Sequence, residues 1–344
     1  MFWDKNKTVV IRPFSIAANI SCRARSLLLQ KVLVDLGADE SFENAVKKIK
    51  EHYGVKVATS TTRLDVEEHA RIIHEQINEK KLCAVSKNKA SVIIGQSDGS
   101  MIPIVTPKNA IDQFDDQRKN KNHEWKEARL VLARAKGSVD SVYAATLGSV
   151  DAAGAKLADV VKSAGECEET KIHCVGDGAP WIADQIDQKF GTRAYFLLDF
   201  YHVSEYLSQA SKCCNPDAPH DWMHKQQALL KNSMAQNVIK NIHDHLEECT
   251  LKEDCPALKC FNYLSRRLNQ LDYKRAIESD LPIGSGEIES AHRSIVQKRL
   301  KIPGAWWTEK NAQNMLDLRT IRANGLWNEY WTNNQPSVGL LASG

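Results

Sequence analysis

The 344-residue sequence lacks several features that define particular classes of protein. It has no apolar run of about 18 residues, the length that a transmembrane helix requires. The N-terminal stretch MFWDKNKTVVIRPF has no apolar signal-peptide core, and there is no internal repeat or low-complexity segment. The 9 cysteines include no Cys-x-x-Cys pair, which is typical of reduced thiols. We therefore expect a cytoplasmic protein that does not bind membranes.

A large excess of charge of one sign is also lacking, since 46 basic and 43 acidic residues give a net charge of +3. This total is too small to predict nucleic-acid binding, because the distribution of charge matters more than its sum. Basic residues do concentrate in one predicted helix after Gly286, which carries Arg293, Lys298 and Arg299. Such a face is either a solvated surface or a phosphate-binding surface.

Ligands for a zinc ion are present but poorly spaced. The segment NIHDHLEECTLKEDCPALKC contains the following candidates: His243, His245, Cys249, Cys255 and Cys260. Their spacing fits no common zinc module. Zinc therefore remains the less favoured alternative.

Periodicity predicts helices first and a sheet afterwards. SFENAVKKIKEHYG is predicted to be a helix capped by Ser41 and ended by Gly54. A second amphipathic helix, TRLDVEEHARIIHEQI, follows a short connection, so the pair is compatible with either a helix-turn-helix or plain helical packing.

The middle of the chain predicts a mixed α/β sheet. ASVIIGQSDGSMIPIVTP has two β-rich runs around Asp98-Gly99, a hairpin signal. Strands EARLVLARA and SVYAATLG follow, and then helices alternate with the strands KIHCVGD and AYFLLDF. This order predicts a mixed sheet covered by helices. From His202 to about Leu281 nearly all signals are helical, and one further helix is expected in WWTEKNAQNMLDLRTIRANGLWNEYW.

Three acidic residues lie where strands end or a helix begins, namely Asp98, Asp177 and Glu289. Rigid elements can aim such side chains from distant positions at one point. An Asp-Gly pair after a strand is also ordinary turn chemistry, so each aspartate alone leaves both interpretations open.

The predicted helix around Glu289 separates two glutamates. At about 100° per residue, Glu289 falls beside Val296 and Leu300, at the margin of the apolar stripe. Glu287 projects to the solvated side. A carboxylate beside a buried stripe is costly unless it is paired or binds a metal. We therefore favour Glu289 as the functional residue; an ion pair with Arg293, one turn later, is the simpler explanation.

The series EHYGV, SDGSMIPI, GDGAPWI, LDFYHVSEYL, GSGEIES and RLKIPGAWW resembles bacterial insertion-sequence transposases with an RNase H-like DDE domain, the ISKra-type group. In this resemblance Asp98, Asp177 and Glu289 occupy the positions of the acidic triad. Asp199-Phe200-Tyr201-His202 resembles the Cys/Asp-x-x-His element of Mutator-like transposases. Further matches, NAQNMLDLR and NGLWNEYW, lie near the C-terminal end.

The resemblance implies an RNase H-like mixed sheet with flanking helices, an N-terminal helical region and an all-helical insertion. The implied domains are a helix-turn-helix-like DNA-binding region at 1–85, the first part of the catalytic domain at 86–205, the insertion at 206–281, the Glu helix and C-terminal helices at 282–332, and a tail at 333–344. The implied partners are double-stranded transposon ends and target DNA, bound by a homodimer or higher oligomer associated with the nucleoid.

The implied chemistry is two-metal phosphoryl transfer with Mg²⁺, for which Mn²⁺ can substitute. Asp98 would bridge both ions, and Asp177 and Glu289 would each hold one. Residues expected to contact DNA are His202, Arg293, Lys298, Arg299, Trp181 and Trp306. His202 is equally explained as a buried histidine near Asp199, and the tryptophans as core residues.

Parts of the sequence also suggest two other functions. A haloacid-dehalogenase-like phosphatase needs a nucleophilic aspartate two residues before Asp98, and Gln96 occupies that place, so this function is excluded. A catalytically inactive or domesticated transposase that acts as a DNA-binding protein remains the alternative. DNA binding without metal-dependent cleavage would distinguish it.

Overall fold

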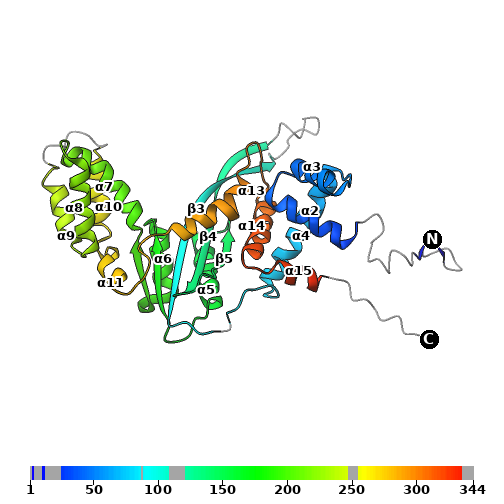
Figure 1. Ribbon diagram of the computed structural model, residues 1–344, viewed down its shortest axis with the longest axis horizontal. Helices are drawn as coiled ribbons and strands as arrows, with labels where there is room; N and C mark the ends of the chain where they lie inside the picture. Colours follow the sequence, from blue (N-terminus) through cyan, green and yellow to red (C-terminus); the bar gives the residue numbers. More distant parts are fainter. Residues whose placement is uncertain are drawn as a thin grey trace. The chain divides into compact units, whose positions relative to one another are not determined.

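The computed structural model describes residues 2–3, 10–11, 25–86, 88–107, 121–246 and 255–334 (Figure 1). They belong to two compact units. Unit 1 draws on residues within Met1–Ala84, Met101–Lys126 and Arg293–Gly344, and unit 2 on Val85–Ser100 and Glu127–His292. Within the described ranges, every helix is too short or too polar to span a lipid bilayer.

A five-stranded sheet carries the fold, with strand order β5-β4-β3-β6-β7. The strands are β3 (Val92–Pro107), β4 (Lys121–Ala135), β5 (Val142–Thr146), β6 (Lys171–Gly176) and β7 (Ala194–Leu198). β3 pairs with β6 and β6 with β7 in parallel, whereas β4 and β5 pair antiparallel. The prediction of a mixed α/β sheet is therefore confirmed. A separate short pair, β1 (Phe2–Trp3) and β2 (Val10–Ile11), is antiparallel.

The hairpin predicted at Asp98-Gly99 is wrong, because β3 runs through both residues without a turn. Gly99 serves a packing purpose instead. A Cβ atom at Gly99 would lie 2.0 Å from Oε1 of Glu127 on β4, closer than any real contact. The glycine therefore makes room for a neighbouring side chain, and Asp98 lies inside a continuous strand.

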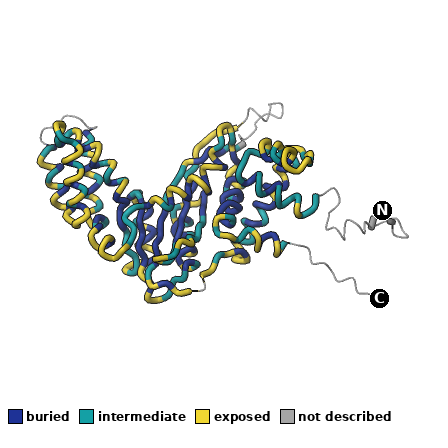
Figure 2. The backbone as a smooth tube through the Cα atoms, viewed as in Figure 1, coloured by how far each residue is buried: buried dark blue, intermediate teal, exposed yellow. Residues whose placement is uncertain are grey.

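Two helices pack with the strands of unit 2, α5 (Val150–Ser163) and α6 (Pro180–Phe190). Both were predicted from their periodicity. Ser149 caps α5 by accepting from the amide of Ala152, and Pro180 occupies the first turn of α6, where no donor is needed. Their apolar faces share a buried cluster with the strands that includes Ile93, Leu157 and Ile182. Figure 2 shows the strands of the sheet largely buried.

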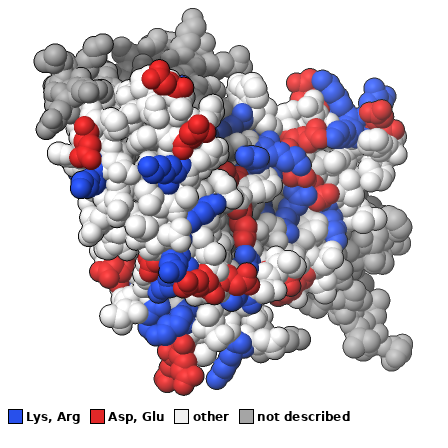
Figure 3. All heavy atoms as spheres, turned by 60° about the vertical axis from the view of Figure 1, so that its left-hand side comes forward, with Lys and Arg blue, Asp and Glu red and all other residues white. Residues whose placement is uncertain are grey.

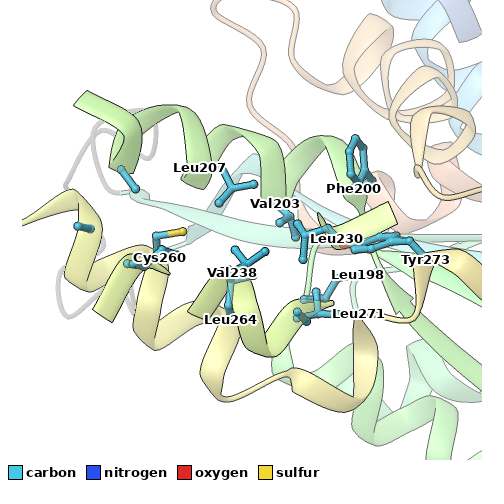
Figure 4. Close-up of a cluster of buried hydrophobic side chains, with 14 of the residues drawn as sticks. Leu198, Phe200, Val203, Leu207, Leu230, Val238, Cys260, Leu264, Leu271 and Tyr273 are labelled. Carbon is cyan, nitrogen blue, oxygen red and sulfur yellow. The ribbon is translucent and has the colours of Figure 1, made fainter. Parts of the chain in front are cut away.

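A helical region follows β7 and has its own core. It comprises α7 (Phe200–Cys214), α8 (Pro219–Lys231), α9 (Ala235–His243), α10 (Pro256–Ser265) and α11 (Tyr273–Glu278). α7 packs against α8 and α10. Figure 4 shows Leu207, Val238 and Leu264 converging between these helices, and this cluster continues to Leu198 of β7. The core therefore joins the helical region, called the insertion below, to the end of the sheet. Residues 247–254, with Cys249, lie outside the described ranges.

Unit 1 is mainly helical. Its helices are α2 (Leu27–Asp39), α3 (Phe42–Tyr53), α4 (Thr59–Asn78), α13 (Lys298–Leu300), α14 (Glu309–Ala323) and α15 (Trp327–Asn333). The predicted ends of α3 are confirmed: Ser41 accepts from the amide of Asn44, and Gly54 is left-handed. The single C-terminal helix that was predicted is two helices, interrupted at Gly325, which has φ +73°. α4 packs along α14, so sequence-distant helices form one core. Of the predicted tail, 335–344 is not described.

Candidate functional site

The parallel register places Asp98 and Asp177 level with each other. Gln96 on β3 pairs with Val175 on β6, and each aspartate lies two residues further along its own chain. Neighbouring strands are about 4.8 Å apart, and residues of equal register point to the same face. Chain segments nearly 80 residues apart therefore bring two carboxylates together, one inside β3 and one directly after β6.

The pKa of Asp98 is raised above its ordinary value, chiefly because burial removes water from its carboxylate and also because Asp177 repels it. Three groups act in the opposite direction: His292, the Gly99 amide and His202. The amide donates to Oδ1 over 2.7 Å. The site thus holds two acidic groups in a setting that favours a cation or a proton between them.

The loop after β6 is held by the insertion. The Tyr263 hydroxyl donates to the carbonyl of Asp177 at 2.6 Å, and the Arg267 guanidinium donates to the carbonyl of Gly178 at 2.9 Å. Burial raises the pKa of Tyr263, so the hydroxyl keeps its proton. Gly178 has φ +82°, a conformation that favours glycine. The Asp177 backbone is therefore fixed from two directions.

The helix that carries the glutamates is not a regular α-helix. α12 (Gly286–Ala291) continues into a π-helical segment, His292–Gln297, before α13. A π-turn holds about one residue more than an α-turn, so each residue advances roughly 80° instead of 100°. Over the six residues of the π segment the face shifts by roughly a third of a turn, and the predicted alignment of Glu289 with Val296 and Leu300 is lost.

The predicted positions of the two glutamates are consequently reversed. Glu289 is exposed, and Glu287 is half-buried. Arg134 of β4 grips Glu287 with two donors: Nε lies 2.8 Å from Oε2, and Nη2 bonds to Oε1. Among the described residues no hydrogen bond or ion pair engages the Glu289 carboxylate. Glu287 is thus a structural partner, and Glu289 is the carboxylate open to a ligand.

α12 is tied to β3 beside Asp98. The amide of Ile288 donates to Oε1 of buried Gln96 at 2.9 Å. The His292 ring nitrogen Nε2 lies 3.1 Å from the Asp98 carbonyl and 3.5 Å from its carboxylate. Glu289 precedes His292 by three residues, and such residues are neighbours on a helix surface. Glu289 therefore lies one turn from a side chain that contacts Asp98.

Asp199 joins the start of α7 to the segment before α12. Its Oδ1 accepts from the amides of Tyr201 and His202, at 2.6 and 3.1 Å, and its Oδ2 accepts from the amide and hydroxyl of Ser285. The residue is 2% exposed. His202 is half-buried, 3.5 Å from the Glu205 carboxylate and edge-on to the Tyr263 ring. Asp199 is therefore a scaffold, whereas His202 faces the aspartate pair closely enough to affect Asp98.

The basic residues of unit 1 have different environments. Arg299 is 2% exposed, lies 4.7 Å from the rings of both Phe42 and Trp307, and donates to the carbonyl of Gly37. Burial lowers its pKa to about 10. Its predicted contact with DNA is therefore corrected to a packing role, because its guanidinium is enclosed by protein. Arg293 is exposed, and exposed Lys298 lies 3.4 Å from Asp39.

The two tryptophans also differ. Trp181 of α6 is half-buried, with the Arg129 guanidinium 5.4 Å from its ring. Trp306 in unit 1 is 43% exposed and lies beside the rings of His123 and Trp125.

Figure 3 shows basic and acidic side chains interspersed over one face of the molecule. Any DNA contact on that face would therefore depend on local clusters rather than on a broad basic surface.

Ligands for a metal are not gathered into a compact set. Across the described residues, no group of three or more His, Cys, Asp or Glu side chains is close enough to hold a metal ion. The pair Asp98 and Asp177 offers hard oxygen ligands of the kind that Mg²⁺ prefers. Glu289 is exposed and one turn from His292, and it does not complete a three-ligand group with the two aspartates. The oxygen ligands of Asp98 and Asp177 thus fit a divalent cation, and the Glu289 carboxylate is separated from them.

Comparison with known proteins gives the family. The profile of UPF0236, described as an uncharacterised protein family, matches residues 20–334. The chain belongs to the UPF0236 family. A relative from Streptococcus gallolyticus, named UPF0236 protein in vanSb 3′ region, is 24% identical over 228 residues, which cover 64% of this chain and 50% of the relative. The aligned part thus spans half the length of that relative.

Sequence reasoning missed several residues of the site in this UPF0236 chain. His292, Tyr263 and Arg134 contact Asp98, Asp177 and Glu287, respectively. His292 follows Glu289 by one helical turn, and this spacing was a usable signal. Arg134 and Tyr263 lie 153 and 86 residues from their partners, so no local pattern could have linked them.

Proposed function

We propose that the protein is a DDE transposase that cleaves and joins DNA strands at insertion-sequence ends with the help of divalent cations. The observation that carries this proposal is the level pair of Asp98, on β3, and Asp177, directly after the neighbouring parallel strand β6, with the pKa of Asp98 raised. A glutamate-bearing helix held against the same strand by His292 supports it. Two neighbouring carboxylates repel each other, and a divalent cation bound between them relieves this repulsion.

The strand order supports an RNase H-like fold within this proposal. β3 lies at the centre, with β4 and β5 on one side and the parallel strands β6 and β7 on the other. The helical insertion between β7 and α12 then separates the second aspartate from the glutamate. This matches the order that the resemblance implies, with helices α7 to α11 in the place of the insertion.

Asp98, Asp177 and Glu289 would hold the cations, Mg²⁺ or Mn²⁺. When bound, such cations would supply an activated oxygen nucleophile and stabilise the leaving oxygen. The chain's own residues prepare the site. His292 fixes the Asp98 main chain, Tyr263 fixes that of Asp177, and exposed Arg293 is available to a DNA phosphate. A homodimer or higher oligomer on double-stranded ends and target DNA is part of the proposal.

A cleavage assay tests the function. Purified protein is incubated with end-labelled DNA from the element's termini, after chelation and with Mg²⁺, Mn²⁺ or Ca²⁺ added back. We expect cleavage with Mg²⁺ and Mn²⁺, little with Ca²⁺, and loss of at least about a hundredfold in Asp98→Asn, Asp177→Asn and Glu289→Gln. Glu287→Gln is the matched control, because its partner is Arg134. Full activity in chelator would refute the proposal.

A second candidate is a transposase derivative that binds DNA without cutting it. The observation that favours it is the lack of a three-ligand cluster among the described residues. The same assay separates the two functions. DNA binding by the wild type without cleavage under any metal would support the derivative, whereas metal-dependent cleavage that requires Asp98 would exclude it.

A further inference from the structure

A pocket of about 320 Å³ lies in the insertion, between α7 and α10. Its lining consists of Tyr206, Lys259, Asn262, Tyr263, Arg266 and Arg267. The pocket adjoins the candidate site, since Tyr263 and Arg267 donate to the carbonyls of Asp177 and Gly178. A ligand here would therefore lie beside the loop that carries Asp177.

Among the described residues, those that line the pocket include three basic side chains and no carboxylate. Arg267 uses its donors on the carbonyls of Gly178 and Tyr263, which fixes the guanidinium without neutralising its charge. Arg266 is exposed, and among the described residues no acidic side chain lies within ion-pair distance of either arginine. The adjacent positive charges of Arg266 and Arg267 in the pocket lining attract an anion.

The aromatic wall is ordered. The rings of Tyr206 and Tyr263 stack with centroids 4.2 Å apart and an angle of 8°. The Arg267 guanidinium lies 4.4 Å from the Tyr263 centroid, and His202 meets Tyr206 edge-on at 5.4 Å. Both tyrosine rings are therefore packed against neighbouring side chains. A rigid aromatic wall gives a stacking surface at low entropic cost.

Stabilisation of α10 and of the Asp177 loop explains only part of this arrangement. Cations near the C-terminus of a helix offset its dipole, and α10 ends at Ser265. That effect explains the position of Arg267, which also braces the Asp177 loop. It requires neither the exposure of Arg266 and Asn262 nor a concave space bordered by stacked tyrosines.

We propose that this pocket binds an unpaired DNA strand next to the cleaved phosphodiester, with the arginines on phosphate and Tyr206 against a base. The inference rests on the proposed function for the identity of the ligand as DNA. An unpaired strand is favoured over a duplex because only unstacked bases offer a face to an aromatic side chain. The volume lies at the lower end of the range for small-ligand pockets, about 300–1,000 Å³, which suits one nucleotide.

Binding of DNA in chelator tests the pocket separately from cleavage. Fluorescence anisotropy is measured with a labelled single-stranded oligothymidylate and with a blunt duplex of equal length. We expect Tyr206→Leu to weaken single-strand binding about tenfold. Arg266→Ala should weaken it several-fold and lower the slope of log affinity against log salt by about 0.7, whereas Arg266→Lys should restore most of that slope.

Lys225→Ala is the matched control, because Lys225 is exposed on α8 and does not line the pocket. Pocket variants that bind the single strand as the wild type does would overturn the inference. Equal losses on duplex and single strand would also overturn it, since stacking would then contribute nothing. Tighter binding of the RNA of the same sequence would reassign the pocket to RNA. Failure of the cleavage assay with intact single-strand binding would remove the proposed function and leave the pocket in place.

Discussion

The two neighbouring glutamates should separate stability from activity. Glu287→Ala removes the carboxylate that Arg134 grips with two donors, while Glu289→Ala removes an exposed carboxylate. Hydrogen bonds to charged groups contribute about 1.5–3 kcal/mol. The Glu287 side chain is 37% exposed and that of Arg134 is 15% exposed, so solvent screening reduces the effect. We expect Glu287→Ala to lower the free energy of unfolding by about 1–2 kcal/mol.

The expected pattern for Glu289→Ala is the reverse. A surface substitution changes stability by less than about 0.5 kcal/mol, yet DNA cleavage should be abolished. Urea denaturation followed by tryptophan fluorescence gives the stability, and the cleavage assay is run well below the unfolding midpoint. Arg134→Ala completes a double-mutant cycle, in which the coupling with Glu287 should account for most of the loss.

One result would refute this reasoning. If Glu287→Ala is as stable as the wild type and inactive, while Glu289→Ala is active, then the exposed carboxylate is not the functional one. The π-helical segment His292–Gln297 would then be an incorrect basis for assigning the two faces.

Three further predictions follow from individual side chains. Burial raises the pKa of Asp98 above its ordinary value of 3.8, so the protonated carboxyl group stabilises the folded state, and this stabilisation is lost as pH rises through the pKa of the folded state. Asp98→Asn should therefore raise the melting temperature at pH 8 in chelator, measured by calorimetry. The same substitution should abolish the stabilisation by added Mg²⁺, about 2.7 kcal/mol at a hundred times its dissociation constant. Asp199→Ala should destabilise the protein by about 2–4 kcal/mol, because a helix cap and a buried acceptor are lost, and Asp199→Asn by less; equal unfolding curves would contradict its scaffold role. Arg299→Ala should destabilise the protein by about 3 kcal/mol, because its guanidinium is buried. Arg293→Ala should leave the free energy of unfolding unchanged. It should lower the slope of log duplex affinity against log salt concentration by about 0.9.

Local sequence signals predicted elements whose ends are capped or whose faces are strictly periodic. α3 begins after Ser41 and ends at Gly54 as predicted, because capping depends on residues within one turn. β6, α6 and β7 follow in the predicted order, and Pro180 and Gly191 mark the two ends of α6. Asp177 follows a strand and Glu289 lies near the start of a helix, as predicted, whereas Asp98 lies inside β3.

Tertiary structure decided the features that depend on distant partners. β3 is one strand through Asp98-Gly99, where Glu127 of the neighbouring strand β4 fills the space above the glycine, and β6 pairs only with the earlier part of β3, from Val92 to Gln96. Arg299 is buried because Phe42 and Trp307 enclose its guanidinium. The faces of Glu287 and Glu289 were set by the π-helical segment, which no 3.6-residue periodicity contains. The sequence by itself thus determined which residue types stand at the element ends, and only long-range pairing determined which side chains are enclosed and which remain open to a ligand.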